Sequence, residues 1–132
     1  MFAPKKVRRT ILHFGTDRAV LHLRARFLRQ MGYRVLNAND GFEAIQLAAL
    51  AKVDAVVLDL DRNHAEVDLV ATEIKRCRPK VPTILVAEEG APLNVAYGLA
   101  DALVLKRDTL NMLVTALEAV LAADIGTPAK AS

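Results

Sequence analysis

The segment DAVVLDL, residues 54–60, carries the pattern that decides the fold. Its centre, AVVL, is apolar and rich in β-branched side chains, a composition typical of a strand buried on both faces of a parallel sheet. We therefore predict a central strand over residues 54–58 that stops at Asp59. A carboxylate directly after a buried strand makes Asp59 the first candidate for a functional position.

Strands and helices alternate on both sides of this segment. Short apolar stretches predict four further strands, at residues 10–14, 33–38, 83–87 and 102–105. Apolar residues at helical spacing predict helices at residues 17–31, from Asp40 to about residue 51, and at residues 66–78, 94–100 and 110–123. Five strands joined by helices through short connections predict an α/β fold, a doubly wound five-stranded parallel sheet with helices on both faces.

Capping signals delimit the first two helices. Asp17 is placed to cap the first helix and Gly32 to end it, while Asp40 and Glu43 have the spacing of a capping box for the second. The apolar positions of the first helix that we expect to face the core are Val20, Leu23, Phe27 and Met31.

Length and composition indicate one ordinary domain. The chain has 132 residues, 53% of them hydrophobic, and a single cysteine, so neither a disulfide nor a structural metal is expected to stabilise it. We predict a basic N-terminal extension at residues 1–9, a single domain at residues 10–123 and a flexible tail at residues 124–132. No apolar run approaches 18 residues and no signal segment opens the chain, so we expect a cytoplasmic protein without membrane contact.

Positive charge is concentrated near the N-terminus. Up to Arg34 there are nine lysines and arginines against Asp17 alone, whereas the rest of the chain holds 9 basic and 14 acidic residues. Four basic residues of the first helix have the spacing of one helix face: Arg18, His22, Arg26 and Arg29. A solvated face is the favoured interpretation, because no aromatic residue or glycine-rich loop accompanies the charges; nucleic-acid binding through this helix is an alternative hypothesis.

The functional site of such a sheet is expected at the carboxyl ends of its strands, near the switch in strand order. The residues at these ends are Gly15, Thr16 and Asp17, Asp59, Ala87 and Glu88, and Lys106. The sequence contains no candidate for a catalytic triad or for paired acid and base carboxylates, and we predict no enzyme activity.

The order of elements, the motif ANDGFEAI at residues 38–45, DAVVLDL and the segment ALVLK ending at Lys106 resemble the receiver domain of bacterial two-component response regulators. The resemblance spans essentially the whole chain. It implies a flavodoxin-like sheet with strand order 2-1-3-4-5, a phosphoacceptor position at Asp59, and a phosphate-contacting position at Lys106.

Other positions depart from the family pattern. Gly15 and Thr16 stand where receivers carry the two acidic residues that hold Mg²⁺, and Ala87 stands where they carry a hydroxyl at the end of strand four. Leu103 replaces the switch aromatic of strand five, and Arg107 replaces a proline. Magnesium requires several oxygen ligands, and the remaining candidates are weak: Asp17, Asp59 and Asp61. We therefore expect a degenerate receiver, or pseudo-receiver, without a cofactor, in which Asp59 faces only Lys106.

These expectations lead to a stand-alone signalling protein of a two-component phosphorelay system that acts by protein contact without phosphorylation. By resemblance the partner is a histidine kinase, an output protein or a second copy of the chain. The expected docking face is formed by the fourth helix, fifth strand and fifth helix, over residues 94–123. The main alternative is an orthodox Mg²⁺-dependent receiver that is phosphorylated on Asp59.

Overall fold

The computed structural model describes residues 8–60, 64–91 and 95–125 of the chain. Five parallel strands form one sheet in the order β2-β1-β3-β4-β5, which confirms the predicted topology. The strands are β1 (Thr10–Phe14), β2 (Arg34–Ala38), β3 (Ala55–Asp59), β4 (Thr83–Ala87) and β5 (Ala102–Leu105). Each lies within one residue of its predicted bounds.

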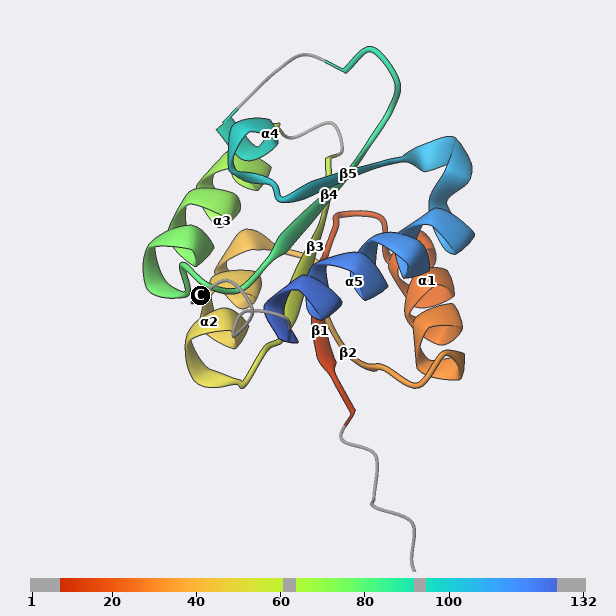
Figure 1. Ribbon diagram of the computed structural model, residues 1–132. Coiled ribbons are helices and arrows are strands. Elements are labelled where there is room, and N and C mark those ends of the chain that lie inside the picture. Colours follow the sequence, from red (N-terminus) through yellow and green to blue (C-terminus); the bar gives the residue numbers. More distant parts are fainter. Residues whose placement is uncertain (1–7, 61–63, 92–94, 126–132) are drawn as a thin grey trace, which may run out of the picture.

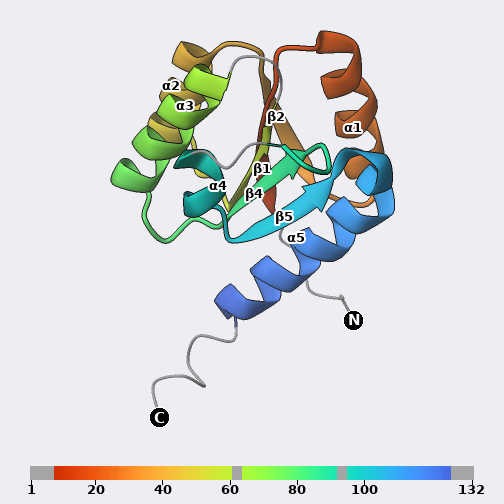
Figure 2. The ribbon, with the colours of Figure 1, turned by 90° about the horizontal axis from the view of Figure 1, so that it is seen from above.

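Helices cover both faces of the sheet (Figure 1). They are α1 (Arg18–Gln30), α2 (Gly41–Leu50), α3 (His64–Cys77), α4 (Val95–Leu99), the 3₁₀ turn η1 (Lys106–Asp108) and α5 (Thr109–Ile125). Helices α1 and α5 lie on one face and α2, α3 and α4 on the other, as the view from above also shows (Figure 2). None of the helices in the described segments is long and apolar enough to cross a lipid bilayer.

The sheet separates two hydrophobic cores. Alternate residues of the central strands point to opposite faces, so Leu12 and Leu58 pack beneath α2 and α3, whereas Ile11 and Val57 pack beneath α1 and α5. All five residues of β3 are buried, as its sequence predicts. The strand therefore ends at Asp59, which lies at the upper edge of the sheet, the edge formed by the carboxyl ends of the strands.

The predicted caps are present. The Asp17 carboxylate accepts hydrogen bonds from the backbone N–H groups of Ala19 and Val20, at 3.0 and 3.2 Å. Asp17 is therefore the N-cap of α1. Gly32 has a φ of 99°, a left-handed conformation that suits glycine, and it ends the same helix. Asp40 accepts a hydrogen bond from the N–H of Glu43 at 2.8 Å and caps α2.

The predicted core face of α1 is wrong in part: Phe27 packs against the core on this side of the sheet, whereas two of the other predicted residues lie at the surface. Leu23 and Met31 are 63% and 52% exposed. The residues that face the sheet are Leu21, Arg24, Ala25 and Leu28. The buried stripe is offset by about one residue from the predicted one. The prediction followed apolar residues alone, whereas the buried stripe includes a charged residue, Arg24.

The side chain of His13 lies in the core on the α1 and α5 side of β1 and is fully buried. Neither ring nitrogen has a hydrogen-bond partner among the described residues. Burial and, to a smaller extent, the positive charge of Arg24 lower the pKa of the imidazole, and the neighbouring Asn37 raises it slightly; together these effects shift the pKa from 6.5 to about 3. His13 is therefore a neutral core side chain at physiological pH.

This pKa predicts a loss of stability in mild acid. Between pH 6.5 and about 3 the unfolded chain binds a proton on His13 that the folded chain does not bind. From pH 7 to pH 5 the residue should therefore remove roughly 2 kcal/mol from the free energy of unfolding. In urea titrations at the two pH values, His13→Leu should lose correspondingly less stability than the unaltered protein. Equal losses would show that His13 does not titrate in this way.

Candidate functional site

Asp59 lies at the carboxyl end of β3 and is only 3% exposed. Each of its carboxylate oxygens faces a different cation. Arg24 donates a hydrogen bond from Nη1 to Oδ2 at 3.0 Å, and the ammonium of Lys106 lies 3.4 Å from Oδ1. The predicted pair between Asp59 and Lys106 is present, but the expectation that Asp59 faces only Lys106 is wrong.

Arg24 is the residue that sequence reasoning missed. It lies in the middle of α1 with 7% of its side chain exposed, against 26% for Lys106. A buried guanidinium requires a partner with opposite charge, and Asp59 provides it. A signal was present in the sequence: Leu21, Arg24 and Leu28 have the i, i+3, i+7 spacing of one helix face, so an arginine on this stripe indicates a buried ion pair.

Gly15, at the end of β1, leaves room for this arrangement. A Cβ atom at Gly15 would lie 3.1 Å from the Cβ of Asp59 and 3.3 Å from Cδ2 of Leu21, both closer than ordinary packing distances. Leu21 belongs to the helix that carries Arg24. The absence of a side chain at Gly15 therefore allows α1 and the end of β3 to approach each other closely.

Comparison with known proteins identifies the fold. No protein-family model matches the sequence, and no curated protein matches it. Among solved structures, a CheY-like receiver domain from Methanospirillum hungatei is 21% identical with a TM-score of 0.80, and covers 89% of this chain and 96% of its own. The response regulator TrrA from Thermotoga maritima, solved in complex with Mg²⁺-BeF, is 23% identical with a TM-score of 0.77, at coverages of 86% and 99%. The chain has the fold of a response-regulator receiver domain.

A third neighbour, a protein of the streptococci, has a TM-score of 0.80 at 19% identity. The match covers 94% of this chain and 56% of that one. The neighbour is described as belonging to a family of redox sensors that evolved from two-component response regulators. All three identities lie below 25%, so these similarities establish the fold and leave the activity to be argued from the site.

The site does not fit the divalent cation that the receiver fold implies. Magnesium is held by several oxygen ligands, whereas the ion pairs at the end of β3 supply one carboxylate, that of Asp59, beside the two cations Arg24 and Lys106. Asp17 already caps α1, and Asp61 lies outside the described residues. Within the described segments no three histidine, cysteine, aspartate or glutamate residues form a group suited to a metal ion.

The other positions that depart from the receiver pattern lie in β4 and β5 or shortly after β1 and β5. Ala87 is buried at the end of β4 and offers a methyl group where a hydroxyl is expected, while Leu103 of β5 is 44% exposed. Thr16 is exposed beside Gly15. Arg107 forms an ion pair with Glu89 at 2.7 Å, but both side chains are largely exposed, so this pair adds little stability.

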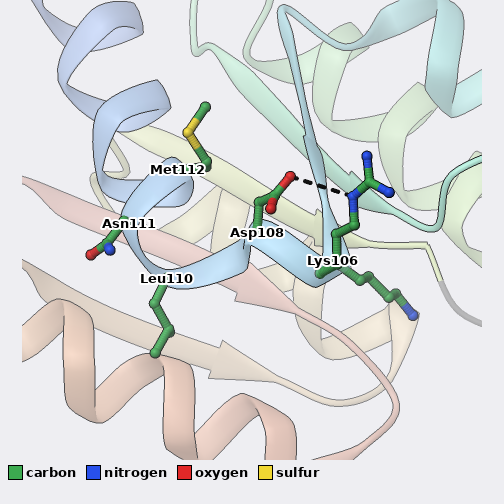
Figure 3. A pocket seen from close by; sticks show the side chains of 6 residues that line it. Lys106, Asp108, Leu110, Asn111 and Met112 are labelled. Atoms are coloured by element: carbon green, nitrogen blue, oxygen red, sulfur yellow. Dashed lines mark ion pairs between the residues drawn. The ribbon is translucent and has the colours of Figure 1, made fainter.

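A hollow opens beside Lys106, where η1 leads into α5 (Figure 3). It has a volume of about 570 Å³. Its lining residues are Lys106, Arg107, Asp108, Leu110, Asn111 and Met112. The side chains of Leu110, Asn111 and Met112 project from the first turn of α5, and Asp108 pairs with Arg107 (Figure 3). Lys106 thus belongs to both the Asp59 site and the outer surface.

The basic residues of α1 lie on the outside of the helix. Arg18, His22, Arg26 and Arg29 are all exposed, and Arg29 donates a hydrogen bond to the carbonyl of Val35. They take no part in the contacts of Asp59. Arg24 is the one basic residue of α1 that is buried.

The burial of the two cations predicts unequal costs of removing them. Arg24→Met leaves the carboxylate of Asp59 in the core without its nearer cation and should lower the free energy of unfolding by about 3 kcal/mol. Lys106→Met removes a partly exposed charge and should cost about 1 kcal/mol. Arg26→Met, an exposed position on the same helix, is the control and should change stability by less than about 0.5 kcal/mol. Urea unfolding would measure all three; equal costs for Arg24 and Arg26 would contradict the buried pair.

Proposed function

We propose that this protein is a pseudo-receiver, a signalling module that acts through protein contacts and does not require phosphoryl transfer to Asp59. The observation that carries the proposal is the pairing of Asp59 with two cations of its own chain, Arg24 and Lys106. Phosphoryl transfer depends on access to the acceptor oxygen and on cations that neutralise the transferred group. Here the acceptor position is almost fully buried and its charge is already compensated.

The proposed docking surface consists of α4, β5 and the start of α5. Large apolar side chains are exposed on these elements: Val95, Tyr97, Leu103, Leu110 and Met112. Exposed apolar area bordered by polar groups favours association with another protein. The hollow beside Lys106 adds a concave region to the same surface. A histidine kinase, an output protein or a second copy of the chain is the partner proposed from the receiver fold.

The description of the streptococcal neighbour supports a role outside orthodox phosphorylation, because that family of redox sensors is said to have evolved from response regulators. The alternative function, Mg²⁺-dependent phosphorylation of Asp59, would use Oδ1. This oxygen accepts no hydrogen bond from the described residues. Its ion pair with Lys106, at 3.4 Å, is longer than the 3.0 Å contact between Oδ2 and Arg24. The two functions therefore make opposite predictions for a phosphoryl donor.

Incubation with acetyl phosphate and Mg²⁺ should leave the protein without a phosphoryl group, because Arg24 and Lys106 already neutralise the acceptor. Intact-mass spectrometry would measure the outcome, with Asp59→Asn treated in parallel. A stoichiometric phosphoryl adduct that disappears in Asp59→Asn would establish the orthodox alternative.

Changes on the proposed docking surface should affect association more than changes at Asp59. Tyr97→Ala and Asn111→Arg should each weaken self-association in analytical ultracentrifugation, or retention of a partner in a pull-down, by about tenfold if they lie near the centre of the interface. Asp59→Ala, compared at equal folded concentration, should have a smaller effect. Phe42→Ala, which removes an exposed aromatic from α2, is the surface control. The reverse ranking would refute docking through α4, β5 and α5.

A further inference from the structure

We propose that Arg24 is a built-in counter-cation that takes the place of the divalent ion in this receiver-fold site and excludes that ion from it. This inference deepens the proposed function, on which it rests, by naming the residue that makes the site independent of metal. It starts from the contact between Nη1 of Arg24 and Oδ2 of Asp59 at 3.0 Å, between side chains that are 7% and 4% exposed.

The charge balance of the site supports this role. One carboxylate, Asp59, faces two cations, Arg24 and Lys106, so the three side chains carry a net positive charge. A divalent cation is attracted to a site with excess negative charge and is repelled by one of this sign. Poor solvation strengthens the repulsion, because Arg24 lies where water screens charge weakly.

The space around Arg24 supports the same role. Gly15 stands at one of the two positions where the family resemblance places the metal-binding acids, and a Cβ atom there would press on both Asp59 and Leu21. Leu21 lies one turn before Arg24 on the buried stripe of α1. The glycine that removes a metal ligand therefore also makes room for the helix that supplies the guanidinium.

The positive charge of Arg24 also acts on its surroundings. Besides burial, it lowers the pKa of His13, which is neutral and has no hydrogen-bond partner among the described residues. A neutral His13 adds no positive charge to the site, so Arg24 and Lys106 are the cations that compensate Asp59. If Arg24 acted by packing alone, its charge would not matter. The response of Arg24 variants to added cations therefore distinguishes a role in packing from a role as a counter-cation.

The first arm restores the acidic pair with and without Arg24. The double variant Gly15→Asp/Thr16→Asp keeps the arginine, and the triple variant adds Arg24→Ala. Ten millimolar Mg²⁺, measured by thermal unfolding, should raise Tm of the triple variant by roughly 5 °C and leave the double variant and the unaltered protein unchanged. If the triple variant folds only with Mg²⁺, that dependence is the same result. An equal rise in the double variant, or no response in the triple variant, would overturn the inference.

The second arm replaces the missing side chain with a small ion. Ten millimolar methylguanidinium should raise Tm of Arg24→Ala by a few degrees relative to the same concentration of sodium, because the ion can occupy the space beside Asp59. Arg24→Ala/Asp59→Asn, which lacks the carboxylate, should show no rise. If Arg24→Ala does not fold, its yield of refolded protein with and without the ion gives the readout. Absence of rescue, or equal rescue of the double variant, would contradict a cation site.

The outcomes separate this inference from the proposed function. A phosphoryl adduct on the unaltered protein would refute the pseudo-receiver proposal without altering the comparison of the double and triple variants. Conversely, Mg²⁺ binding by the double variant would refute the role of Arg24 while leaving docking through α4, β5 and α5 intact.

Discussion

A carboxylate buried at the end of the central strand must be neutralised, and this constraint organises the upper part of the molecule. Asp59 is carried into the core by β3, whose five residues are all buried. Its charge is compensated by cations from opposite ends of the chain, Arg24 of α1 and Lys106 after β5. The rotation of α1 follows, because Arg24 can reach Asp59 only if the stripe that contains Leu21 and Leu28 faces the sheet. The close approach of that stripe in turn requires Gly15.

The two edges of the sheet use carboxylates for different purposes. At the lower edge, Asp54 accepts a hydrogen bond from the N–H of Thr10 at 2.7 Å, and Asp101 accepts one from Thr83 at 2.8 Å. Each therefore secures the start of a neighbouring strand, and each has a partly exposed cation nearby, Arg9 or Lys75. At the upper edge, by contrast, the described partners of the Asp59 carboxylate are side chains: Arg24 donates a hydrogen bond to it and Lys106 forms an ion pair with it. Its surroundings, rather than its residue type, set it apart as the functional candidate.

Local patterns in the sequence predict most of the fold, because each depends on neighbours within a few residues. The apolar run of β3, the caps at Asp17 and Asp40 and the left-handed Gly32 are of this kind. The family resemblance also brought Asp59 and Lys106 together. Arg24 was missed because its partner lies 35 residues away and because a pattern based on apolar residues excludes arginine from the core. A contact made only in the tertiary structure leaves a weak trace in the sequence, in this case one charged residue on an otherwise apolar stripe.

The position of Lys106 links the site to the surface proposed for docking. Its ammonium faces Asp59, while its backbone begins η1, which leads into the exposed first turn of α5. In a receiver that alternates between a phosphorylated and an unphosphorylated state, this lysine would change its partners with each change of state. In the proposed pseudo-receiver Arg24 pairs with Asp59 at all times. We therefore expect Lys106 to keep its position, so that η1 presents the same surface to a partner throughout. Regulation would then depend on the amount or location of the protein or its partner, since the ionic state of the site does not change.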